Sequence, residues 1–153
     1  MQNSTGHSIL ALDLGRQTGY CMLNCNGQMQ WGSLRLQHET KTLRCCVDLK
    51  RRLESWVNIP EIVCWERTYA QGWAGRILCG LETIVEVFCM ERQIKHYVVT
   101  PTQWKKQLLG RAHASQTEYL QWVNQSYSVV NADAAAALCI AAYIAAREGI
   151  MLA

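Results

Sequence analysis

The sequence predicts a mixed α/β fold in which a five-stranded sheet is flanked by helices. A short apolar segment that ends on an acid occurs twice, at 7–13 and at 62–66. Between these segments the apolar residues change from alternation to helical spacing, which indicates a helix that separates two strands. The 153 residues suffice for one domain with a substantial core, so we expect residues 1–153 to form a single domain.

The first three strands are expected at 7–13, 18–24 and 28–36. The Asn26-Gly27 pair favours a tight hairpin turn, because both residues tolerate a positive φ. These segments therefore predict an antiparallel three-stranded meander at the start of the chain.

The second half alternates helices with strands. A helix at 40–57 leads to the strand 62–66, and a strand that returns after a helix is most simply a parallel neighbour in the same sheet. This arrangement places Glu66 at the same end of the sheet as Asp13. The remaining expected elements are a loop at 69–75, a helix at 76–92, a strand at 94–99, a helix at 100–109, a helix at 115–127 opened by a Ser115/Glu118 capping box, and an alanine-rich helix at 131–148.

The composition is that of a globular protein, with 50% hydrophobic and 18% charged residues. The net charge of +3 permits nucleic-acid binding without arguing for it. The eight cysteines form no zinc-binding spacing, and no secretory signal or membrane span is evident. We therefore expect reduced cysteines and a soluble, cytoplasmic protein with no membrane partner.

Three acids have settings that suit a metal site. Asp13 and Glu66 end apolar strands, and Asp133 opens the last helix. A carboxylate at the tip of a buried strand costs stability unless it binds a cation. Each acid taken alone is also explained by an ordinary role, respectively as a turn cap, a solvated strand end and a helix N-terminal residue favoured by the dipole. Together they predict the metal-binding core of a nuclease.

Four segments occur in this order along nearly the whole chain: ALDLGRQTGY, VCWERTY, PTQWKKQLLGRA and NADAAAALCIAAYIAA. In these segments the chain resembles the RuvC family of Holliday junction resolvases, and more its compact phage-type members than the longer bacterial ones. It implies a ribonuclease H-like fold, with acids on the first and fourth strands and on the terminal helix. The implied location is a bacterial cell or a phage-infected host.

The resemblance also implies an activity, which is the resolution of four-way (Holliday) DNA junctions by paired symmetric nicks. Two Mg²⁺ ions, or Mn²⁺ as a substitute, would be held by Asp13, Glu66 and Asp133, with Asp13 bridging both. Such ions lie about 3.5–4 Å apart in two-metal sites. Two symmetric cuts require a homodimer. The helix at 76–92 is the candidate interface, although a buried core helix would show the same pattern.

Two positions depart from the family pattern. The last motif normally has a second acid three residues after the first, and Ala136 stands there instead. The absence of this second acid predicts that cleavage is severely impaired. Alanine at this position is explained either by an engineered inactivation or by natural variation. A family lysine near the start of the penultimate helix is replaced by Gln116, with Arg111 or His113 as candidates for its phosphate contact.

The candidate DNA-binding residues are one aromatic and three basic side chains. Tyr69 is suited to stack on an unpaired base at the junction centre, with Trp73 as an alternate, and an ordinary loop aromatic is the other explanation. Lys105, Lys106 and Arg111 are suited to phosphate contacts, although a solvated helix face would carry the same charges.

Two other classes of function stay open at this point. A branched-DNA-binding protein that does not cut is favoured if Ala136 is natural. A fragment of a sugar-kinase or actin-type ATPase shares the DLGRQTG turn, but the second glycine-rich phosphate motif of that class is not found in the sequence.

Overall fold

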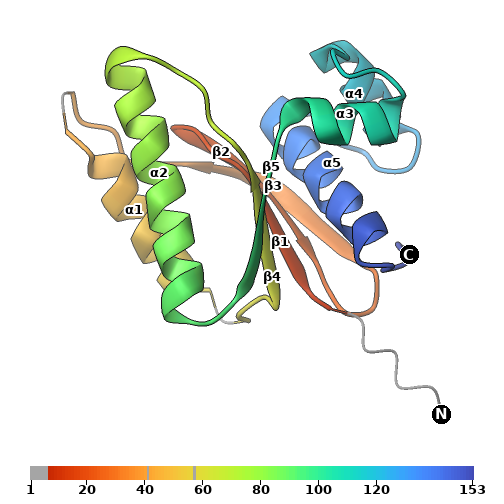
Figure 1. Ribbon diagram of the computed structural model, residues 1–153, viewed down its shortest axis with the longest axis horizontal. Coiled ribbons are helices and arrows are strands. Elements are labelled where there is room, and N and C mark those ends of the chain that lie inside the picture. The colour runs from red at the N-terminus through yellow and green to blue at the C-terminus, as the bar shows by residue number, and fades with distance from the viewer. Residues whose placement is uncertain (1–6, 41, 57) are drawn as a thin grey trace.

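A five-stranded mixed sheet separates two groups of helices in the computed structural model, which describes residues 7–40, 42–56 and 58–153 (Figure 1). Helices α1 and α2 cover one face of the sheet, and α5 covers the other, together with α3 and α4 (Figure 1). Within the described ranges, no helix is both long and apolar enough to cross a membrane. The elements are β1 (Ile9–Asp13), β2 (Gln17–Leu23), β3 (Met29–Arg35), α1 (Arg44–Glu54), β4 (Ile62–Glu66), α2 (Gly72–Glu91), β5 (Lys95–Val99), α3 (Pro101–Leu109), α4 (Gln116–Asn124) and α5 (Ala132–Arg147).

The strand order is β3-β2-β1-β4-β5. Strands β1, β2 and β3 pair antiparallel, whereas β4 pairs parallel with both β1 and β5. The predicted meander and the predicted parallel neighbours are therefore confirmed. Because Leu12 pairs with Trp65, the next residues along the two strands, Asp13 and Glu66, fall side by side at one edge of the sheet.

Side chains of the central strands alternate between two hydrophobic cores. Ile9 and Ala11 of β1 point to the core beneath α5, while Leu10 and Leu12 point to the core beneath α1 and α2. Strand β4 repeats the pattern, because Ile62 and Cys64 join the α5 core and Val63 and Trp65 join the other. Both faces of these strands are buried, which explains their nearly continuous apolar sequence.

Three predicted helices have boundaries that differ from the structure by three residues or more, and one of them, α4, ends at Asn124 rather than at 127. Helix α2 begins at Gly72, inside the segment predicted as a loop, and its N-cap Gln71 makes no side-chain capping bond. Gly72 has a φ of +66°, so the chain turns sharply there without the Ser, Thr, Asp or Asn that marks most helix starts. Helix α1 covers 44–54 rather than 40–57, and the predicted end at residue 57 lies outside the described residues.

All eight cysteines lie within the described ranges, and all are free thiols. Burial raises the pKa of Cys21 and of Cys139 to about 12, so both stay protonated near neutral pH. They pack in the core beneath α5 as small apolar side chains.

Candidate active site

Asp13 and Glu66 lie next to each other at the carboxyl ends of β1 and β4. Successive side chains of a strand point to opposite faces, so Asp13 follows Ile9 and Ala11 onto the α5 side of the sheet. Glu66 follows Ile62 and Cys64 to the same side. Both acids line one pocket of about 240 Å³. The predicted pairing of these two carboxylates is therefore present in the structure.

Asp133 reaches this edge because α5 begins directly against β2. The helix is capped by Asn131, whose side-chain oxygen accepts a hydrogen bond from the Ala134 amide at 2.9 Å. Gly19 pairs with Asp13 across β1 and β2, and a Cβ atom at Gly19 would lie 2.0 Å from the Asp133 carbonyl oxygen. A glycine is thus required here so that the first turn of α5 can pack beside the strand that carries Asp13.

The negative charges of Glu66 and Asp133 both act on Asp13. Burial, followed by the negative charges of Glu66 and Asp133, raises the pKa of Asp13 to about 7. Burial also raises the pKa of Glu66 and the pKa of Asp133. Three acids in a partly buried site repel one another when all are ionised, so a cation among them would be strongly stabilised.

The donor chemistry of the site fits a hard divalent cation such as Mg²⁺, which prefers oxygen ligands from Asp and Glu. The side chains as they stand do not converge, however. Among the residues described, no group of three or more His, Cys, Asp or Glu side chains is arranged to hold a metal ion. Metal binding would therefore require side chains of this group to turn toward a shared cation.

Three side chains at this edge had no predicted role in the acidic site. The buried Trp104 indole donates a hydrogen bond from Nε1 to Glu66 Oε2 at 2.6 Å. Burial, with the charge of Asp13 as the next cause, raises the pKa of the nearby Tyr119 phenol to about 12. The Lys105 ammonium, predicted only as a phosphate contact, opposes the effect of burial on the pKa of Glu66. The two aromatic residues come from α3 and α4, and no local sequence pattern links them to Glu66.

The predicted DNA-binding residues occupy different positions around the site. Tyr69 is 70% exposed and lines the same pocket as Asp13 and Glu66. Lys105 is half-buried, with its ammonium 5.4 Å from the centre of the Trp104 ring. Lys106 is exposed on α3. Arg111 is paired with Glu118 at 2.5 Å, and Glu118 also closes the predicted capping box of α4.

Ala136 lies three residues after Asp133 in α5 and is 6% exposed. Residues three apart share one helix face, so a side chain at 136 would extend from the same face as Asp133. Gln116, the other departure from the family pattern, is the exposed first residue of α4.

The fold defined by these elements is that of the RuvC-type resolvases, a branch of the ribonuclease H-like fold. RuvC from Thermus thermophilus superposes with a TM-score of 0.72 at 20% sequence identity, covering 93% of this chain and 96% of RuvC. The same protein in complex with a Holliday junction substrate gives a TM-score of 0.74 at 22% identity, covering 94% of this chain and 96% of that one. The predicted resemblance is thus confirmed as a likeness of fold.

A more distant similarity connects the chain to a viral enzyme. The Holliday junction resolvase of fowlpox virus superposes with a TM-score of 0.55 at 13% identity, covering 94% of this chain and 99% of the viral one. No protein-family model matches the sequence, and the search of curated proteins gave no significant match.

Proposed function

We propose that this protein recognises four-way DNA junctions through a RuvC-type nuclease site whose cleavage is disabled by Ala136. The observation that carries the proposal is the group of three acids, Asp13, Glu66 and Asp133, at one edge of the sheet in a RuvC fold. The similar Thermus thermophilus structure contains RuvC bound to a Holliday junction substrate, which supports junction DNA as the ligand.

In the active form of such a site, Asp13, Glu66 and Asp133 would hold divalent ions, Mg²⁺ or Mn²⁺. Two such ions would activate water, neutralise charge on the phosphoryl oxygens and stabilise the leaving 3′-oxygen. The chain itself supplies the acidic edge, the exposed Tyr69 beside it, and the basic residues of α3. Tyr69 would stack on a base unpaired at the junction centre, and Lys105 and Lys106 would contact phosphates.

The presence of alanine at position 136 supports the proposal that this nuclease does not cleave. A methyl group at this position gives Asp133 no acidic neighbour one helical turn further on. A site with fewer carboxylates neutralises less of the charge of two divalent ions, so the second ion would bind weakly. Junction binding, which depends on basic and aromatic side chains, would persist.

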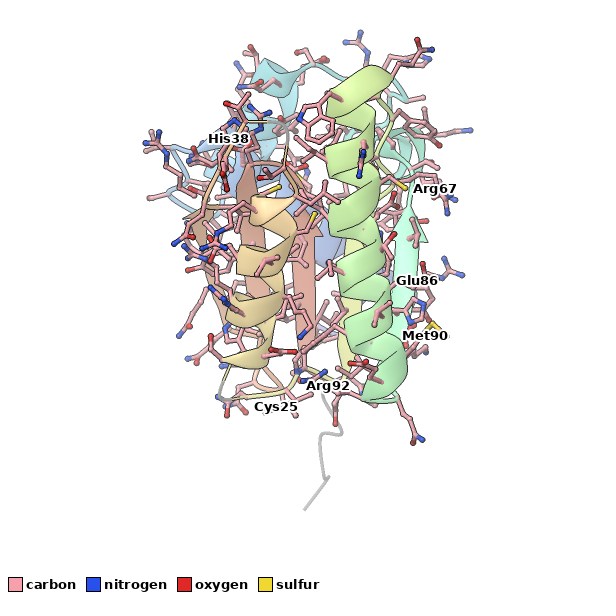
Figure 2. All side chains as sticks on the ribbon, turned by 90° about the vertical axis from the view of Figure 1, so that its left-hand side faces the viewer. Cys25, His38, Arg67, Glu86, Met90 and Arg92 are labelled. Atoms are coloured by element: carbon pink, nitrogen blue, oxygen red, sulfur yellow. The ribbon has the colours of Figure 1, made fainter. Side chains whose placement is uncertain are left out.

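A homodimer through α2 is part of the proposal. Val87 is 42% exposed and Met90 is 65% exposed on this helix. Met90 and Glu86 lie on the side of α2 that faces away from α1 (Figure 2). Exposed apolar side chains on a long helix support a self-complementary contact, and a two-fold dimer would match the two-fold symmetry of a junction.

The test of this function is a binding comparison between a four-way junction and a linear duplex of equal total length. We expect the protein to bind the junction at least about 100-fold more tightly, in EDTA and at fixed salt, as measured by fluorescence anisotropy. Tyr69→Ala should reduce this preference without unfolding the protein, because the side chain is largely exposed.

Equal affinity for junction and duplex would contradict the proposal. Selective junction binding without cleavage in any restored variant would instead favour a protein that binds branched DNA and does not cut it.

A further inference from the structure

Trp104 makes the only direct hydrogen bond to a carboxylate of the acidic site that we find among the described residues. Its indole Nε1 lies 2.6 Å from Glu66 Oε2, and the side chain is 1% exposed. An indole has a single donor and no acceptor, so the bond fixes which group donates and which accepts. The resemblance to RuvC assigned no role to this residue.

The indole is held from several directions. Helix α3 opens with a capping box in which Thr100 and Gln103 bond each other's backbone amides, at 3.4 Å and 2.9 Å. Pro101 occupies the first turn of the helix. The Trp104 ring packs edge-to-face on Tyr119 of α4, with ring centres 5.6 Å apart. A donor fixed in this way can in turn restrict the rotation of the carboxylate that it binds.

The hydrogen bond distinguishes the two oxygens of Glu66. Oε2 is engaged by the indole, and no hydrogen bond to Oε1 is found within the described residues. A carboxylate with one oxygen engaged offers a cation the other oxygen, whereas a free carboxylate also accommodates binding through both.

We propose that Trp104 is a positioning residue of the acidic site, which orients Glu66 so that Oε1 alone is presented to a divalent ion. The inference rests on the proposed function, because it requires a metal at Glu66. Trp104, which lies outside the acid group, would then set the mode of coordination.

A second buried tryptophan in the chain provides a matched control. Trp65 is also 1% exposed, and its Nε1 donates to Glu82 Oε1 at 3.1 Å. This pair lies on the other side of the sheet, because Trp65 packs in the core beneath α1 and α2. Trp65→Phe therefore makes the same chemical change at the same burial, on the opposite face of the sheet, next to Glu66 in sequence but without a bond to it.

The experiment compares Mn²⁺ binding by calorimetry in the original protein, Trp104→Phe and Trp65→Phe. We expect Trp104→Phe to weaken binding about tenfold, as is typical when a hydrogen-bond partner of a metal ligand is lost. Trp65→Phe should bind within about twofold of the original protein, because the Trp65 indole bonds Glu82 and not a carboxylate of the acidic site. If Trp104→Phe does not fold, β-(3-benzothienyl)alanine at position 104 keeps the ring shape and removes only the donor.

Infrared difference spectra with and without Mn²⁺ supply a reading that a purely structural role would not change. Glu66→Gln identifies the Glu66 bands. The separation between the asymmetric and symmetric carboxylate stretches should be wide in the original protein, as in binding through one oxygen. It should narrow in Trp104→Phe, as in binding through two oxygens.

Unchanged Mn²⁺ affinity in Trp104→Phe, or an equal loss in Trp65→Phe, would overturn the inference. Mn²⁺ binding that does not depend on Glu66 would also overturn it. The proposed function fails separately, through the comparison of junction and duplex binding, which is measured without metal.

Discussion

The Ala136→Asp variant is expected to introduce paired, symmetric nicks into a four-way junction in the presence of Mg²⁺, while the Ala136 chain binds the junction without cutting it. The gain should be on the order of 10³-fold in cleavage rate, comparable to restoring one group that stabilises transition-state charge. The physical reason is position, since residue 136 lies on the same helix face as Asp133. A labelled junction separated on a denaturing gel measures both the rate and the symmetry of the cuts.

Ala136→Asn is the matched control for this variant. Asparagine has nearly the shape of aspartate without its charge, so it tests whether the restored group must be an acid. We expect Ala136→Asn to bind the junction and leave it intact. Equal cleavage by the two variants, or cleavage by neither despite tight junction binding, would contradict an acid-dependent nuclease disabled at position 136.

The Gly19→Ala variant is expected to lose about 3 kcal/mol or more of unfolding free energy, because the added methyl group overpacks the contact between α5 and β2. The new Cβ would lie 2.0 Å from the Asp133 carbonyl oxygen and 2.2 Å from its carbonyl carbon. Both are backbone atoms, so no side chain can rotate to relieve the contact. Urea denaturation monitored by circular dichroism measures the loss.

Gly32→Ala on the neighbouring strand is the control for a glycine substitution in this sheet. The three atoms nearest to a Cβ at Gly32 all belong to the end of the Tyr20 side chain, the nearest at 2.8 Å. A side chain can move aside, so we expect a loss of about 1 kcal/mol. Equal losses in the two variants would show that the close approach of α5 is not what requires Gly19.

The order of elements was predictable from the sequence because each has a local cause. Alternating apolar residues and the Asn26-Gly27 turn predicted the meander, and the Ser115/Glu118 capping box predicted the start of α4, which the structure confirms. The predicted start of α2 was wrong because Gly72 turns the chain by its positive φ, without a capping side chain that the sequence would reveal.

The pairing of Asp13 with Glu66 was also predictable, since it follows from two parallel strands that each end on an acid. The hydrogen bond from Trp104 to Glu66 was not, because it joins residues 38 apart that share no periodicity. The need for glycine at position 19 was not predictable from the sequence either, since it arises only where the backbone of α5 contacts β2. The metal-binding role of the three acids stays a prediction.

The most direct test of the account is the titration of the Asp13 carboxyl group by carbon-detected NMR in metal-free protein. The proposed nuclease site requires Asp13, Glu66 and Asp133 to lie close together, so that burial and the two neighbouring acids raise the pKa of Asp13 to about 7. We expect that value in the original protein and a lower pKa of Asp13 in Glu66→Gln, because one negative neighbour is removed. An Asp13 that titrates near its ordinary value of 3.8 in both proteins would contradict a shared acidic site, and with it the nuclease chemistry proposed for this edge of the sheet.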